Sequence, residues 1–143
     1  EREANSGRSV GVVTHSFGDW IARQAYAQMD GFTVTRWISI CPVIREVPAA
    51  QLVRRLIGNR SAEIAVMANP EQASSNHIND SDVRHTTLWA EWDWLVKGKP
   101  ERSVHSVTGT HNSVLFQPNL WKLVESELRS LPNEDVHRQE AVA

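Results

Sequence analysis

The sequence has little of what defines several large classes of protein. It has one cysteine, Cys41, among 143 residues, so no disulfide can form within the chain. Its apolar runs fall far short of the roughly 18 residues that cross a bilayer, and we predict no transmembrane segment. Fifteen Lys and Arg oppose 17 Asp and Glu, for a formal net charge of −2. This balance gives no electrostatic reason to expect nucleic acid as a partner.

The sequence also lacks the common metal and phosphate motifs. Its six histidines are scattered, and it contains neither a His-Glu-x-x-His pattern nor paired cysteines. Its glycines are too far apart to form a phosphate-binding loop. We therefore predict no metal and no cofactor. Cys41 ends an apolar segment just before Pro42, which indicates a packed core thiol, since free cysteine is usually buried.

The strongest positive signal is the segment VGVVTHSFG at residues 10–18. A β-branched run leads into a turn at Ser16, and a helical pattern follows at once, as at the elbow that carries a nucleophilic serine. Such a turn strains the backbone and lifts the hydroxyl clear of the sheet. Gly18 and the small Thr14 would let strand and helix pass close together, and the Phe17 N–H would face a developing oxyanion. The motif alone leaves an ordinary strand-turn-helix connection open.

Two candidate partners for Ser16 follow in the chain. A buried strand is predicted over 84–90, and Asp93 lies just beyond it. An alternating strand over 103–107 leads into a loop that carries His111. Catalytic groups in parallel sheets gather at the carboxyl ends of the strands. We therefore predict that the serine, the acid and the histidine meet at one edge.

Other residues compete for the acid role. Glu91 is two residues from Asp93, which is within the uncertainty of a strand end. Asp80 and Asp82 precede their strand, so they would lie at the wrong end of the sheet. His15 is expected to pack near the elbow without taking part in chemistry.

Six tryptophans are many for this length, and most are expected in the core. Trp92 and Trp94 bracket Asp93, where they would either form an apolar wall that shields the acid or simply pack a loop. His105 falls inside the last predicted strand and is interpreted as structural.

With these segments in place, the chain resembles the α/β-hydrolase superfamily, and within it small bacterial lipases and esterases. The matching segments are the elbow THSFG (14–18), the acid turn WAEWD (89–93), the histidine loop GTHNSVL (109–115) and the helix start QPNLW (117–121). The resemblance covers about residues 8 to 131. It implies Ser16 as nucleophile, Asp93 as acid and His111 as base.

The resemblance implies an α/β fold, with a parallel sheet of about four C-terminal strands and flanking helices. Residues 1–131 would form this partial domain, and residues 132–143 a polar, disordered tail. The family usually has eight strands and places the elbow after the fifth. Its first four strands, and the loop that gives the second oxyanion N–H, would then lie outside this chain. A missing N-terminal half or a partner chain is therefore expected to complete the fold.

Periodicity and turn residues predict the remaining elements. Helices are expected over 20–29, 49–57 and 120–131, a strand over 35–41, an ambiguous helix or strand over 62–67, and a surface loop over 69–82.

The predicted function is hydrolysis of ester-type bonds through a Ser-His-Asp triad and an acyl-enzyme. The substrate would be a small-molecule ester or a lipid-like compound. Two alternatives remain from the sequence: an inactive hydrolase-fold remnant that binds a partner, and a structural domain in which the three residues occur by chance.

Overall fold

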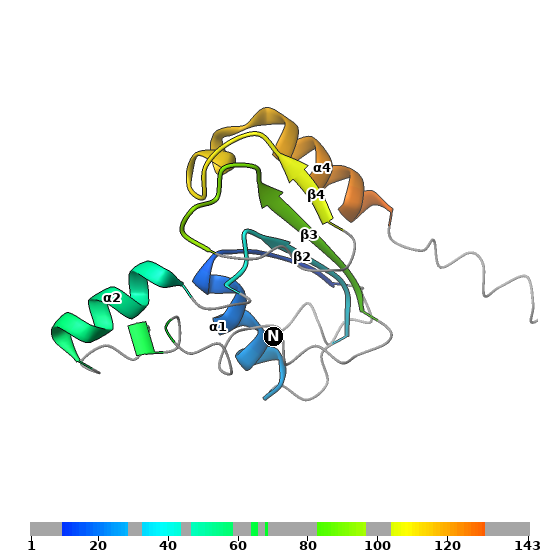
Figure 1. Ribbon diagram of the computed structural model, residues 1–143. Coiled ribbons are helices and arrows are strands. Elements are labelled where there is room, and N and C mark those ends of the chain that lie inside the picture. The colour runs from blue at the N-terminus through cyan, green and yellow to red at the C-terminus, as the bar shows by residue number, and fades with distance from the viewer. Residues whose placement is uncertain are drawn as a thin grey trace, which may run out of the picture.

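The central feature of the molecule is a four-stranded parallel sheet (Figure 1). The computed structural model describes residues 10–28, 33–43, 47–58, 64–65, 68, 83–96 and 104–130. Within them the strands lie in chain order: β1 (Val10–His15), β2 (Val34–Ile40), β3 (Arg84–Ala90) and β4 (Val104–Val107). Each pairs in parallel with its neighbour. The predicted parallel sheet with flanking helices is confirmed, and β3 has the predicted bounds.

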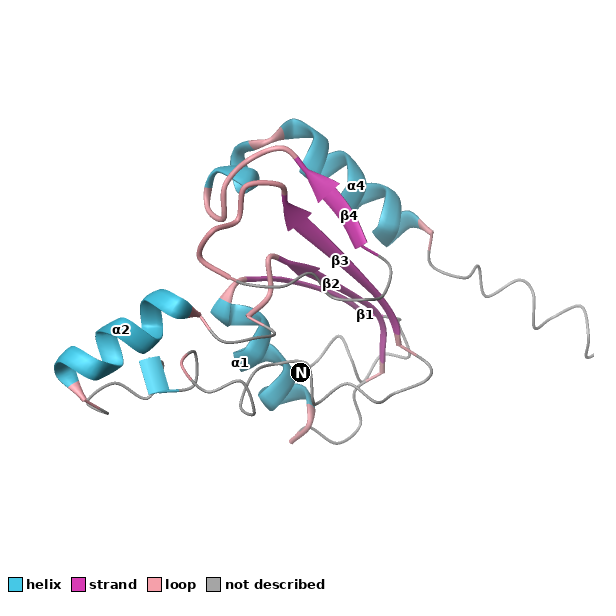
Figure 2. Ribbon diagram, viewed as in Figure 1, coloured by secondary structure: helices cyan, strands magenta, loops and turns pink. Residues whose placement is uncertain are grey.

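Helices connect and cover the strands, as Figure 2 shows. They are α1 (Phe17–Tyr26), α2 (Pro48–Ile57), the short 3-10 helix η4 (Ser113–Phe116) and α4 (Pro118–Arg129). Helix α1 directly follows the turn at Ser16, as the elbow motif predicts, but it begins and ends earlier in the chain than the predicted range 20–29. Proline opens α2 and α4, where its missing N–H costs nothing. No helix in the described ranges combines the length and apolar character needed to span a membrane. The predictions for 69–82 and 132–143 fall outside the described residues.

The sheet is covered on both faces, as expected for parallel strands. Helix α4 packs Leu120 and Val124 against Ile38 and Leu88 on one face. Helix α1 lies on the opposite face, where Ala22 and Tyr26 contact a cluster around Trp37. Helix α2 stands apart from the sheet in Figure 1.

Only some of the tryptophans belong to the core. Trp37 and Trp89 are 1% and 3% exposed, whereas Trp92, Trp94 and Trp121 are about half exposed or more. The prediction that most tryptophans are buried is therefore wrong. The three exposed rings lie beyond strand ends or on the outer side of α4, where no second layer covers them in the described part of the chain.

A buried ionic network fixes α1 to the sheet directly behind the elbow. Asp19, in the first turn of α1, is fully buried. Four side chains donate hydrogen bonds to its carboxylate at 2.5–2.9 Å: Thr14, Trp37, Ser39 and Arg23. Burial alone would raise the pKa of Asp19, but the charge of Arg23 and the neutral donors outweigh it and lower the pKa. The ion pair of Arg23 with Asp19, whose carboxylate is fully hydrogen-bonded, thus anchors the first turn of α1 next to Ser16.

His85 makes this network sensitive to acid. Its Nε2 accepts a hydrogen bond from Arg23 Nη2 at 3.0 Å. Burial, and next the charge of Arg23, lower the pKa of His85 from 6.5 to about 4. The unfolded chain therefore takes up this proton between about pH 6.5 and pH 4, while the folded chain does not. His85 stabilises the fold above pH 6.5, and this contribution is lost as the pH falls to about 4.

We expect the free energy of unfolding to fall by up to about 3 kcal/mol from this group between pH 7 and pH 4. Below pH 3.8 protonation of Asp19 adds to the loss, because its pKa is also lowered in the fold. Urea unfolding at pH 7, 5.5 and 4 measures the effect. The His85→Gln variant should show a flatter dependence between pH 6.5 and 4, and an unchanged slope in that variant would contradict the assignment.

Candidate active site

The carboxyl ends of all four strands meet at one edge of the sheet, because the strands are parallel. Ser16 follows β1, Cys41 follows β2, Asp93 lies three residues beyond β3, and His111 lies four beyond β4. Main-chain hydrogen bonds of 2.9–3.0 Å continue the ladder past the strands: Ser16 N to Ile40 O, Cys41 N to Leu88 O and Glu91 N to Val107 O. The loops that carry these side chains are therefore held in register with one another.

Ser16 occupies the sharp turn between β1 and α1. Its φ of 53° and ψ of −131° are unusual for a residue with a side chain, so the backbone is strained as the elbow motif predicts. Phe17 is the first residue of α1. Its N–H is among those that find no acceptor within the helix, and this group is the predicted oxyanion donor.

The prediction that Gly18 lets the strand and the helix pass close together is wrong. Gly18 is exposed, and a Cβ added there would meet no described atom within 4 Å. No close passage of strand and helix depends on it. The bond from Thr14 Oγ1 to Asp19, at 2.5 Å, ties the end of β1 to α1 instead.

A chain of hydrogen bonds joins the three residues predicted from the sequence. Ser16 Oγ lies 2.7 Å from His111 Nε2, and His111 Nδ1 lies 2.7 Å from Asp93 Oδ2. Because a carboxylate can only accept, His111 Nδ1–H is the donor and Nε2 accepts from the Ser16 hydroxyl. The Asp93 side chain is fully buried, and that of His111 is 6% exposed. Water therefore competes little for these bonds.

The turn after β3 holds Asp93 in place. Its Oδ1 accepts main-chain N–H bonds from Leu95 at 3.0 Å and Val96 at 3.1 Å. Its own N–H donates to Ala90 O at 3.2 Å. One carboxylate oxygen is thus occupied by the turn, which leaves the other aimed at His111.

The structure separates Asp93 from its closest rival. Glu91 is exposed, and its Oε2 accepts a bond from Thr108 Oγ1 at 3.2 Å. It makes no contact with His111 among the described interactions. Asp80 and Asp82 lie outside the described residues. The acid that contacts the histidine is therefore Asp93.

The histidine loop has a shape that depends on glycine. Gly109 has a φ of 143°, and a Cβ there would lie 3.2 Å from Ser113 Oγ and from main-chain atoms of Val114. Ser113 Oγ accepts from Thr110 N at 2.8 Å, and Val114 N donates to Thr110 O at 3.0 Å. Trp92 N donates to Gly109 O at 3.1 Å and so fastens the acid turn to this loop.

Cys41 lies beside the acid and the histidine, which the sequence did not predict. Its Sγ, one carboxylate oxygen of Asp93 and one ring nitrogen of His111 are within 4.8 Å of one another. Ala90 N donates to Sγ at 3.3 Å. Burial raises the pKa of the Cys41 thiol to about 12, and Asp93 adds to the rise. A protonated thiol is a poor nucleophile and a poor metal ligand, and Asp93 and His111 already bind each other.

Trp92 and Trp94 do not form the apolar wall. Their side chains are 63% and 73% exposed, so most of each ring faces solvent. The carboxylate of Asp93 is instead enclosed by its own turn and by the thiol of Cys41.

The two histidines given packing roles lie in different surroundings. His15 packs at the elbow as predicted, and its Nε2–H donates to the main-chain oxygen of His111 at 3.0 Å. His105 lies in β4, is 48% exposed and stands 4.0 Å from Glu127. The sequence contained no signal for the His15 contact, because it joins residues far apart in the chain.

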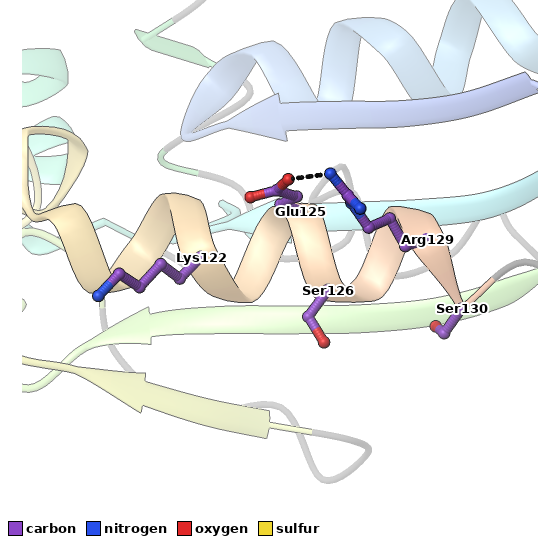
Figure 3. Close-up of a pocket in the computed structure, with 5 residues that line it drawn as sticks. All are labelled: Lys122, Glu125, Ser126, Arg129 and Ser130. Atoms are coloured by element: carbon purple, nitrogen blue, oxygen red, sulfur yellow. Dashed lines mark hydrogen bonds and ion pairs between the residues drawn. The ribbon is translucent and has the colours of Figure 1, made fainter.

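A separate hollow of about 570 Å³ lies along the outer side of α4 (Figure 3). Its lining residues are Lys122, Glu125, Ser126, Arg129 and Ser130. The ion pair of Glu125 with Arg129, at 2.6 Å, joins two well-exposed side chains one turn apart. Such pairs contribute little to stability, and this surface is a solvated helix face.

Comparison with known proteins found no family model and no curated protein that matches this chain.

Proposed function

We propose that this chain carries the catalytic site of a serine hydrolase of the α/β-hydrolase type, acting on ester bonds. The observation that carries the proposal is the bonded series Ser16, His111 and Asp93, with two links of 2.7 Å. Three further features support it: the strained turn at Ser16, its place before a helix and the common edge of the parallel strands.

The proposed reaction has two steps, acylation of Ser16 and hydrolysis of the acyl-enzyme, and the same three residues act in both. Ser16 Oγ attacks the acyl carbon while His111 Nε2 takes its proton, and the Phe17 N–H faces the developing oxyanion. The ester C–O bond then breaks, and His111 gives the proton to the leaving alcohol. His111 then deprotonates a water, which attacks the acyl carbon. The bond from that carbon to Ser16 Oγ breaks, the acid leaves, and His111 returns the proton to Ser16. Asp93 holds the histidine tautomer and stabilises its cation throughout.

The substrate we propose is a small-molecule ester or lipid-like compound with an apolar acyl or aryl group. The support is a pair of exposed rings in the acid turn, Trp92 and Trp94, which are the sequence neighbours of Asp93. Aromatic rings of this kind offer apolar contact area at a wet surface.

We further propose that another polypeptide segment, which pairs with the edge of β1 that faces away from β2, completes the site. This strand ends the sheet and pairs only with β2 among the described strands. It is mostly apolar, and Val13 is 38% exposed. Unpaired edges of this kind accept a further strand. A segment placed there would run next to Ser16, where a second oxyanion donor is needed. The same edge favours the second candidate, a non-catalytic module that binds a partner chain.

Reaction with a fluorophosphonate probe tests the proposal. We expect the folded chain to gain one adduct, which mass spectrometry should place on Ser16 within the tryptic peptide 9–23. The reason is that only an activated hydroxyl attacks the probe at a useful rate.

The urea-unfolded chain is the control and should stay unmodified, because the three residues separate on unfolding. A folded chain without an adduct on Ser16 would reject an activated serine in this chain and favour the binding module.

A further inference from the structure

We propose that His15 is a positioning residue, whose Nε2–H holds the main-chain oxygen of His111 and so sets the histidine over Ser16. This inference rests on the proposed hydrolase function. His15 ends β1 and directly precedes Ser16. A single residue therefore joins the strand that carries the nucleophile to the loop that carries the base.

The contact is direct and well shaped. His15 Nε2 lies 3.0 Å from His111 O, although 96 positions separate the two residues. Because a carbonyl oxygen only accepts, His15 must carry its proton on Nε2. The two rings also pack, with centroids 5.1 Å apart and planes inclined by 45°.

The other bonds of the histidine loop do not replace this one. Those between Thr110 and Ser113, and between Thr110 and Val114, close the loop on itself. The bond from Trp92 N to Gly109 O and the link to Asp93 tie the loop to the end of β3. Apart from the catalytic bond to Ser16 itself, the His15 bond is the described hydrogen bond that locates the loop relative to β1.

The charge state of His15 suits this position. Burial lowers the pKa of His15, and the neighbouring His111 lowers it further, against the opposing effects of the His111 carbonyl and Asp93. A neutral His15 at pH 7 places no like charge next to His111 when that ring takes the Ser16 proton. His15 can then hold the base without opposing its protonation.

Three variants at residue 15 test the role of the donor. His15→Gln keeps an N–H near the position of Nε2, whereas His15→Met has similar length and no donor. His15→Phe is a second donor-free variant that keeps an aromatic ring. For each, the fluorophosphonate labelling rate and the kcat and KM for an aryl ester are measured, normalised to the folded fraction from circular dichroism. His105→Phe, on exposed β4, is the matched control.

We expect the donor-free variants to label about 10- to 100-fold more slowly, because misplacement of a catalytic group by about 1 Å costs a factor of this size. The loss should fall on kcat, with KM unchanged, and His15→Gln should recover most of the rate. His105→Phe should match the wild type.

A folded donor-free variant that labels at the wild-type rate would overturn this inference and leave the hydrolase intact. So would a His15→Gln variant as slow as His15→Met, because the loss would then follow the ring and not the donor. A wild-type chain that gains no adduct on Ser16 would overturn the proposed function itself, and the role of His15 with it.

Discussion

Replacing Ser16 with alanine is expected to lower the hydrolysis of an activated aryl ester by at least about 10³-fold. In a complete triad, loss of the nucleophile costs about 10⁶ in kcat. A site with one oxyanion donor has a lower wild-type rate, since a missing donor lowers kcat by about 10²–10³-fold. The rates of the wild type and of Ser16→Ala should still differ greatly, because without Oγ no acyl-enzyme can form.

The measurement is the rate of aryl-alcohol release by wild type and Ser16→Ala at equal folded concentration. Ser126→Ala, an exposed serine on α4, is the control and should match the wild type. The thermal midpoint should change little, because the hydroxyl removed from Ser16 bonds His111 Nε2, and both residues belong to the candidate site. A Ser16→Ala variant that retains the wild-type rate would exclude Ser16 as the nucleophile.

Asp93→Asn is expected to lower kcat by up to about 10⁴-fold, with little loss of stability. The amide oxygen can still accept the bonds from Leu95 N and Val96 N, which hold the turn. The amide nitrogen would donate to His111 Nδ1 and place the imidazole proton on Nε2. That tautomer cannot accept the proton of Ser16.

Glu91→Gln is the matched control, since it makes the same chemical change two residues away. Glu91 is exposed and bonds Thr108, so its amide should leave kcat within about 3-fold of the wild type. For both variants, the activity is measured as kcat for the aryl ester and the stability by urea unfolding. If Glu91→Gln were the impaired variant and Asp93→Asn the active one, the assignment of the acid would be reversed.

The fold was largely accessible from local patterns. The run RHTTLWA at 84–90 is short and contains two β-branched threonines followed by Leu88 and Trp89, and it forms β3 with the predicted bounds. Gly58 and Pro118 mark helix ends through their own backbone chemistry, so α2 and α4 were predicted to within about two residues. The elbow motif placed a helix directly after Ser16, but its range was predicted too late in the chain, at 20–29, because a helix that follows a strained elbow has no separate start signal.

The buried network around Asp19 and Arg23 could not be predicted from local patterns. Asp19 and Arg23 are four residues apart on a helix, which from sequence alone indicates an exposed surface pair. Their burial depends on Trp37 and Ser39, which reach them only once β2 pairs with β1, and on His85, which arrives with β3. The predicted passage at Gly18 failed for a related reason, since local spacing does not say which side of a helix meets the sheet.

The sequence by itself determined which residue types follow which strands, and so placed a serine, an acid and a histidine after strand ends in hydrolase-like order. Periodicity carries that information because it is local. The tertiary structure decided the rest: the 2.7 Å links of His111 to Ser16 and Asp93, the choice of Asp93 over Glu91, the bond from His15 and the protonated thiol of Cys41. These contacts join residues as many as 96 positions apart, and they depend on strand order, register and burial, which no local pattern encodes.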